Sequence, residues 1–229
     1  MTKIVSTFIF LSLFCIKSNS VFAEEVSCED IVPQPEINFQ TSYGNLVYDR
    51  SKTKEELTEV GGEFGVVEKG LFAAGLSTVK INWEISVDTI NRVSNEGGEV
   101  CIIPMKLNLY IGYEDPVIYI SKGLQENTCE YNMVLRHEQA HQQINVTALE
   151  HFVAKIRDVL PEVSKEVGAE KTTSLRELVE VNNKITKAYI AQIEPMVKVF
   201  KAELKKEQSK LDNMENYQME GEICKKETK

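Results

Sequence analysis

The pattern of hydrophobic and polar positions divides the chain near residue 126 into a strand-rich part and a helical part. In the first part apolar and polar positions alternate, most clearly over residues 106–111 (KLNLYI), which is typical of strands with one buried face. In the second part apolar residues recur every three or four positions, the period of an α-helix. We therefore expect a single α+β domain over residues 24–229, with residues 24–126 rich in strands and residues 127–229 helical.

Several strands and one short helix are predicted in the first part. The helix covers residues 54–60, because Thr53 and Glu56 have the spacing of a capping box. Gly112 and the pair Asp115-Pro116 separate the last two strands. Since one face is expected to be buried and the other wet, we predict a mostly antiparallel sheet. The expected strands are residues 37–41, 46–48, 78–87, 100–111 and 117–121.

Two long helices are predicted in the second part, as an antiparallel hairpin packed on the sheet. The first begins at Asn127, which forms an N-terminal cap with Glu130 three residues later, and it ends before Pro161 because proline stops a helix. The second covers residues 174–216. Pro195 is expected to interrupt or kink it.

The first residues have the features of a signal peptide. Lys3 precedes a mostly apolar run over residues 4–16, which is shorter than the roughly 20 residues that a membrane-spanning helix needs. Val21 and Ala23 then stand at the two positions that a signal peptidase reads. We expect residues 1–23 to be removed, which leaves a periplasmic or secreted protein with no membrane span. The alternative is an uncleaved membrane anchor.

Removal of that segment leaves four cysteines, an even number that predicts two disulfides in an oxidising compartment. Four cysteines allow three pairings. Cys101 lies in a predicted strand and Cys129 opens the first long helix, so these two could be near neighbours. Cys28 and Cys224 lie near the two ends of the mature chain, and chain ends often lie close together. We expect the pairs Cys101–Cys129 and Cys28–Cys224.

The charge of the chain excludes one class of function. Lys and Arg total 26 against 35 Asp and Glu, which gives a formal net charge of −9. An acidic chain has no general attraction for a phosphate backbone, so we expect no nucleic-acid partner. The glycines between residues 61 and 75 lack the order of a phosphate-binding or dinucleotide-binding loop, and we interpret them as turns.

The sharpest chemical signal is the segment from His137 to His141, which reads His-Glu-Gln-Ala-His. On a helix, two histidines four residues apart lie one turn apart on the same face, so both imidazoles can bind one tetrahedral Zn2+ ion. Apolar residues share this face, and the histidines are therefore expected to point inward. Glu138 projects about 100° away, where it can take a proton from a zinc-bound water without occupying a coordination position.

This pentad resembles the active-site helix of the zincin metallopeptidases, whose motif is H-E-x-x-H. The family favours uncharged residues at the two central positions and after the second histidine, and Gln139, Ala140 and Gln142 comply. Gln143 departs from the pattern, because that position is usually hydrophobic. Thr147 stands where the metzincin subgroup has its third histidine, which excludes that subgroup. The chain is also similar to small secreted bacterial zincin-like proteins of unassigned function.

The resemblance implies that the third zinc ligand is a carboxylate on a later helix. In a hairpin that folds near residue 165, residue 139 lies opposite residue 191, and Glu194 is the carboxylate nearest that point. Pro195 could expose Glu194 by disrupting the helix. Glu194 is therefore the expected third ligand.

Three other residues are weaker candidates for the third ligand. Glu180 and Asp212 are carboxylates farther from the estimated point. His151 lies about 15 Å beyond His141 along the same helix, out of reach of a shared ion. We expect His151 to be a surface or hydrogen-bonded histidine.

The motif and the export signal favour a zinc-dependent hydrolase of the cell envelope or exterior, a peptidase by resemblance, acting on a peptide or protein. The last strand before the first long helix could add an extended peptide to the sheet edge, as zincins do. One alternative is a non-catalytic envelope binding module with a degenerate or structural metal site. Another is coincidence, in which the two histidines are core residues with hydrogen-bond partners.

Overall fold

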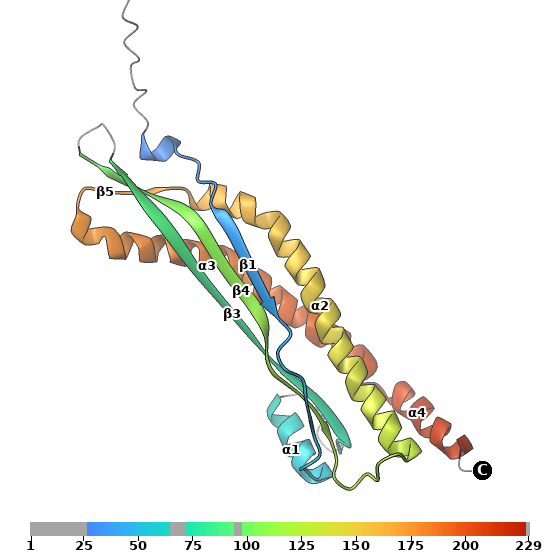
Figure 1. Cartoon of the computed structure of the whole chain (residues 1–229). Helices are drawn as coiled ribbons and strands as arrows, with labels where there is room; N and C mark the ends of the chain where they lie inside the picture. The colour runs from blue at the N-terminus through green and yellow to red at the C-terminus, as the bar shows by residue number, and fades with distance from the viewer. Residues whose placement is uncertain (1–26, 65–71, 94–97, 228–229) are drawn as a thin grey trace, which may run out of the picture.

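The computed structural model describes residues 27–64, 72–93 and 98–227. The predicted signal peptide, residues 1–23, lies outside the described residues. Figure 1 shows a long, narrow sheet with two long helices across one face. The strands are β1 (Glu36–Ser42), β2 (Val47–Asp49), β3 (Gly75–Val93), β4 (Val100–Ile120) and β5 (Glu170–Thr172).

The long strand β4 is the centre of the sheet. β3 runs antiparallel to it along its whole length, while β5, β1 and β2 pair in succession along its other edge. β1 and β2 run parallel to β4, so the predicted mostly antiparallel sheet is wrong, although the α+β class is confirmed. The alternation of polar and apolar residues sets the faces of a strand but not its neighbour. β3 directly precedes β4 in the chain and pairs with one edge of it. β1 and β2 come earlier in the chain and pair with the opposite edge of β4.

The segments 100–111 and 117–121, predicted as two strands, belong to the single strand β4. β4 runs through Pro104, Gly112 and Pro116. Proline cannot donate to a ladder, but both prolines lie where the register with β3 shifts, so few ladder hydrogen bonds are lost.

The helix α1 (Lys54–Phe64) confirms the predicted capping box. The Glu56 amide donates to Thr53 Oγ1 at 3.2 Å, and the Thr53 amide donates to Glu56 Oε2 at 2.6 Å. Thr58 Oγ1 accepts from the amide of Ala73 at 3.0 Å. This contact ties α1 to the residues that lead into β3.

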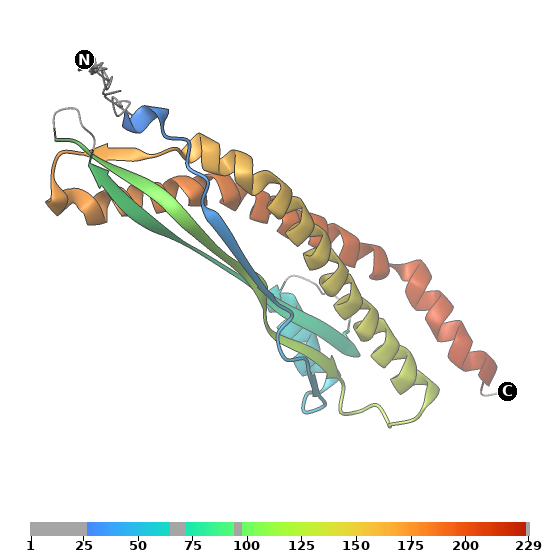
Figure 2. The same ribbon diagram turned by 45° about the horizontal axis from the view of Figure 1, so that its top comes forward.

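The predicted helical hairpin is confirmed as α2 (Cys129–Val167) and α3 (Leu178–Leu211), and α4 (Met214–Glu227) follows it (Figure 2). α2 passes through Pro161 and ends at Gly168, which has φ 69°, and α3 passes through Pro195. The predicted stop at Pro161 and an interruption at Pro195 are therefore wrong, because burial of the helix faces offsets the one hydrogen bond that each proline removes. None of the described helices combines the length and the apolar character that a membrane span requires.

The hydrophobic core lies between the sheet and the helical hairpin. Leu107, Leu109 and Ile111 of β4 are buried against the helices, and each such side chain stabilises the fold by about 1.5–3 kcal/mol. Buried polar groups lie at one end of this core, where the Tyr113 hydroxyl donates to the backbone oxygen of Asn145 at 2.8 Å. The metal-binding candidates lie beyond that point on α2.

The two disulfides join Cys28 to Cys101 and Cys129 to Cys224. Two bonds are present as predicted, but the predicted pairs, Cys101–Cys129 and Cys28–Cys224, are wrong. Cys101 is the second residue of the 21-residue strand β4, so nearly the whole strand separates it from Cys129. At roughly 3.3 Å per residue such a strand carries the chain to the opposite end of the sheet.

Candidate metal centre

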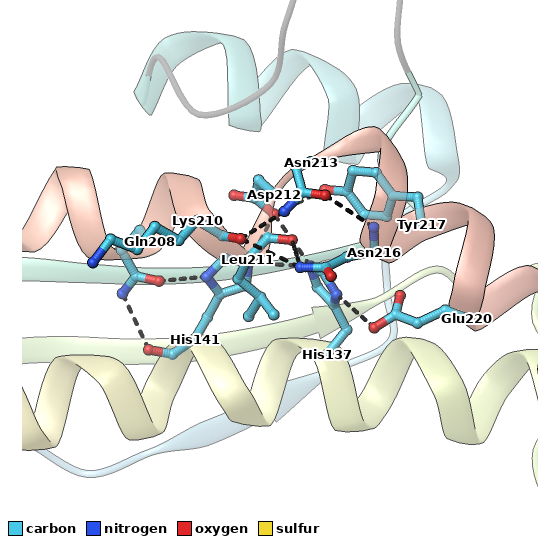
Figure 3. Close-up of polar contacts among 10 residues, drawn as sticks. All are labelled: His137, His141, Gln208, Lys210, Leu211, Asp212, Asn213, Asn216, Tyr217 and Glu220. Carbon is cyan, nitrogen blue, oxygen red and sulfur yellow. Dashed lines mark hydrogen bonds and ion pairs between the residues drawn. The ribbon is translucent and has the colours of Figure 1, made fainter.

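The helix α2 places His137 and His141 one turn apart on its buried face, as the sequence predicts. Thr128 rather than Asn127 caps this helix, since its hydroxyl accepts from the Tyr131 amide at 3.2 Å. The side chains of His137 and His141 point toward the end of α3 (Figure 3). Only 6% of His137 and 8% of His141 is exposed.

Asp212, at the C-terminus of α3, completes a group of three ligand atoms with the two histidines. Its Oδ1 lies 3.1 Å from His137 Nε2 and 2.9 Å from His141 Nε2. The two Nε2 atoms are 3.2 Å apart. The helix ends at this residue and the chain turns through Asn213 into α4, which directs the carboxylate back toward α2 (Figure 3).

The triangle of these three atoms has the size of one face of a tetrahedral metal site. Ligand atoms 2.0–2.1 Å from a zinc ion are separated by about 3.3 Å at tetrahedral angles. The three observed separations, 3.2, 3.1 and 2.9 Å, are slightly shorter. An ion would therefore fit with a movement of a few tenths of an ångström.

The outer ring nitrogens of both histidines have acceptors. His137 Nδ1 lies 3.1 Å from Glu220 Oε1, and His141 Nδ1 contacts Gln208 Oε1. A ring that donates from Nδ1 presents the lone pair of Nε2, so both lone pairs converge on the Asp212 carboxylate. Three converging acceptors repel one another unless a proton or a cation lies between them. This donor set is the strongest indication of a metal site.

Gln208 and Tyr217 hold the ligands in place. Gln208 Nε2 donates to the backbone oxygen of His141 at 3.1 Å and to Asn145 Oδ1 at 2.7 Å. The Tyr217 hydroxyl donates to Asp212 Oδ1 at 2.8 Å, and its ring stacks on His137 with centroids 5.3 Å apart. These contacts orient all three ligands from outside the triangle.

The electrostatics of the metal-free protein follow from these contacts. Burial alone would raise the pKa of Asp212, but the hydrogen bonds from His137 and His141 hold it far below its usual range. Burial disfavours a charged His137, yet its hydrogen bonds to Asp212 and Glu220 raise its pKa to about 9. The pKa of His141 is also raised, because the hydrogen bonds to Asp212 and Gln208 outweigh burial. Without a metal ion, both rings are thus protonated more readily than a free imidazole.

Glu138 lies beside this triangle, against the backbone of β3. A Cβ atom on Gly75 would lie 2.8 Å from Glu138 Oε1, so only glycine leaves room for the carboxylate. The Ser77 amide donates to that carboxylate. Burial raises the pKa of Glu138 to about 7, although both histidines oppose the shift.

The predicted third ligand, Glu194, lies elsewhere on α3, where it pairs with Lys198 at 3.0 Å. The carboxylate that contacts both histidines is that of Asp212, a weaker candidate from the sequence. Because α2 continues past Pro161, the hairpin folds later than estimated, and His141 faces Gln208 rather than a residue near 191. His151 is exposed, as expected.

Gln208, Tyr217 and Glu220 were not predicted from the sequence. The polar segment Asp212-Asn213, which interrupts an otherwise helical stretch, is the signal that points to this region. Asn213 Oδ1 accepts from the Asn216 amide at 2.9 Å, an N-terminal cap for α4.

Comparison with known proteins identifies no relative: no protein-family model, curated protein or solved structure matches this chain. The site is therefore interpreted from its own geometry. His137, His141 and Asp212 could hold a metal ion. Imidazole and carboxylate ligands suit several divalent ions, so the ligand set alone does not specify the metal.

Proposed function

We propose that this protein is an exported zinc-dependent peptidase in which His137, His141 and Asp212 bind the ion and Glu138 is the general base. The convergence of two ring nitrogens and one carboxylate oxygen is the observation that supports the proposal most. Two imidazoles and a carboxylate form the protein ligand set of several catalytic zinc sites, which keep one open position. When bound, the ion lowers the pKa of its water to about 7 and polarises a substrate carbonyl.

The environment of Glu138 supports a catalytic role over a purely structural one. Its carboxylate lies against Gly75 rather than among the three ligand atoms, so it does not compete for the ion. In the metal-free protein burial raises its pKa to about 7, the range in which a carboxylate can both accept and return a proton near neutral pH. In the proposed reaction it takes a proton from the attacking water and gives it to the leaving amine.

The edge strand β3 is where an extended peptide would bind. β4, the last strand before α2, has partners on both edges and cannot accept an added strand, contrary to the sequence expectation. Among the described strands, β3 pairs with β4 alone, and Gly75 and Ser77 lie beside Glu138. A peptide added to this edge would pass next to the proposed base.

The two disulfides are compatible with a secreted or periplasmic protein, since such bonds persist in oxidising compartments. They support the export that the first residues predict. Purification should therefore start from the periplasm or the medium.

A structural metal site in a non-catalytic binding module is the second candidate. Both histidines are buried, and Tyr217 and Glu220 of α4 contact the ligand group from outside. A site closed by a fourth protein ligand would favour this function. The two candidates differ in what they require of Glu138, which only catalysis needs.

The test is the variant Glu138→Gln, assayed with a library of quenched fluorescent peptides and by elemental analysis. We expect turnover to fall by about 10²–10⁴-fold, the usual contribution of a general base, with about one zinc ion retained per chain. Glu162→Gln, on an exposed turn of α2, is the matched control and should retain activity. Retention of zinc with no cleavage by the parent protein would favour the binding module, and absence of zinc from carefully prepared protein would contradict both.

A further inference from the structure

The helix α4 carries part of the metal centre but has little packing of its own. None of its described side chains is buried, whereas α3 buries residues along most of its length. Its links to the site are polar: Tyr217 donates to Asp212, and Glu220 accepts from His137. Figure 2 shows α4 extending beyond the sheet, alongside the first turns of α2.

The contacts of α4 follow one face of each helix. Tyr217, Glu220 and Cys224 have the spacing i, i+3 and i+7, which places them on one face of α4. Cys129 and His137 are eight residues apart on α2, about 80° around the helix axis, and both contact α4. From the end inward, the contacts are the disulfide Cys129–Cys224, then Glu220 with His137, then Tyr217 with Asp212.

On the premise of the metal site proposed above, we propose that the Cys129–Cys224 disulfide holds α4 in place as the outer shell of the metal centre, so that opening this bond weakens metal binding. Glu220 and Tyr217 are positioning residues: the first fixes the ring orientation of His137, and the second orients the Asp212 carboxylate. Because none of its described side chains is buried, α4 separates from α2 once the bond is open. The protein therefore loses metal affinity under reducing conditions.

The two disulfides differ in their access to a reductant. Cys28 and Cys101 are 2% and 1% exposed, while Cys129 and Cys224 are each partly exposed at the end of the helical layer. A dithiol attacks one sulfur of the accessible bond through a mixed disulfide. Two electrons pass to the cystine, each released sulfur takes a proton, and the dithiol becomes a cyclic disulfide. The Cys28–Cys101 bond is expected to react later.

The expected effect is the one measured for other outer-shell changes, a loss of about 10–100-fold in metal affinity. Loss of Glu220 leaves the His137 ring free to rotate or to change tautomer. Loss of Tyr217 leaves Asp212 Oδ1 without its hydroxyl donor. Both changes weaken ligands that remain in place.

The experiment measures Zn2+ affinity of the full chain by competition with a chromophoric chelator. The double variant C129S/C224S is the main arm, because it contains no thiols at this position that could bind zinc themselves. C28S/C101S is the matched control. A second arm treats the parent protein with a dithiol and alkylates the released thiols, with peptide mapping to show which bond opened. Visible spectra of the Co2+ form report coordination geometry for Glu220→Gln, with Glu222→Gln as control.

We expect C129S/C224S and the selectively reduced protein to bind zinc about 10–100-fold more weakly, with the control retaining parent affinity and Glu220→Gln altering the Co2+ spectrum. Equal zinc affinity of C129S/C224S and the parent would overturn the proposal, as would an unchanged Co2+ spectrum. If C28S/C101S does not fold, the reduction arm decides alone. If the His137→Ala variant, with its disulfides intact, binds zinc as tightly as the parent, the proposed metal site itself is wrong. That result differs from a failure of the disulfide proposal, in which zinc still binds through His137.

Discussion

The two halves of the buried stripe of α2 differ sharply in chemistry. Both halves lie on the same helix, and the side chains of both are almost entirely buried. The C-terminal half is apolar except for Ser164 and faces α3, where Phe152 stacks on Phe200 with centroids 4.6 Å apart. The N-terminal half is polar and faces the end of α3 and α4. Its buried residues are His137, Glu138, His141, Gln142 and Asn145.

The difference shows where the fold gives up apolar packing for a buried polar network. Apolar side chains at these positions would stabilise the helix pair at no electrostatic cost, whereas buried charges need partners to offset desolvation. Each polar side chain of the N-terminal half has such a partner: Gln208 binds His141 and Asn145, and the Ser77 amide binds Glu138. A network of this kind is typical of a functional site rather than of a core.

The largest expected effect is a difference between two substitutions, one in each half of the buried stripe. His141→Ala should lower zinc affinity by more than about a hundredfold, since changes outside the ligands alone cost 10–100-fold. Leu149→Ala, at a position that is 0% exposed, should lower the free energy of unfolding by about 2–5 kcal/mol and leave the zinc affinity of the folded protein within about threefold. Urea unfolding with a chelator and zinc competition measure the two quantities. Comparable losses of zinc affinity in both variants would break the comparison.

A smaller effect is expected where β3 approaches the polar half. A Cβ atom at Gly75 would lie 2.6 Å from Val134 Cγ1 and 2.8 Å from Glu138 Oε1, so Gly75→Ala must displace both side chains. We expect a loss of about 1–3 kcal/mol in the free energy of unfolding and a fall in peptidase turnover, with zinc retained. Gly62→Ala is the control, because no heavy atom lies within 4 Å of its added Cβ. Full activity of Gly75→Ala would mean that the position of Glu138 is not critical.

The most gradual effect is a pH dependence confined to the polar half, spread over several pH units. In the metal-free protein the folded-state pKa of His137 is raised to about 9, so its contribution to stability is complete below about pH 6.5 and is lost as the pH rises through 9. The free energy of unfolding should fall by up to about 1.4 kcal/mol per pH unit in this window. Zinc affinity should rise over the same window, because the ion displaces the proton.

Urea unfolding in the presence of a chelator gives the pH slope of the free energy of unfolding, and zinc titration gives the pH slope of the zinc affinity. Both are measured from pH 6.5 to 9. His137→Ala should weaken both, and Leu149→Ala should change neither. Two slopes of the same sign would contradict the assignment of His137 as a ligand.

The features that the sequence predicted correctly are those that depend on neighbours within one or two helical turns. The capping box at Thr53 and Glu56 and the shared face of His137 and His141 follow from spacings of three and four residues. The existence of a helical hairpin also follows from periodicity. Strand directions and disulfide partners did not follow, because they join residues separated by 70 or more positions.

The third ligand illustrates why such errors grow with separation. The estimate placed the fold of the hairpin near residue 165, on the assumption that Pro161 ends α2. α2 instead continues to Val167, and β5 follows before α3 begins. In an antiparallel hairpin, a shift of the turn by one residue changes the residue that lies opposite a given position by two. The later turn therefore places Asp212, and not Glu194, opposite the two histidines.

The sequence alone determined that two imidazoles lie one turn apart on an inward-facing stripe, with a carboxylate beside them, because backbone hydrogen bonds impose that period on any helix. Only the tertiary structure decided that Asp212 faces them, that Glu220 and Tyr217 surround them, and that Cys224 reaches Cys129. Those approaches depend on where each helix ends and how it packs on the sheet. The packing of the helices is decided by many small contact energies added over the whole chain, and the spacing of nearby residues does not reveal that total.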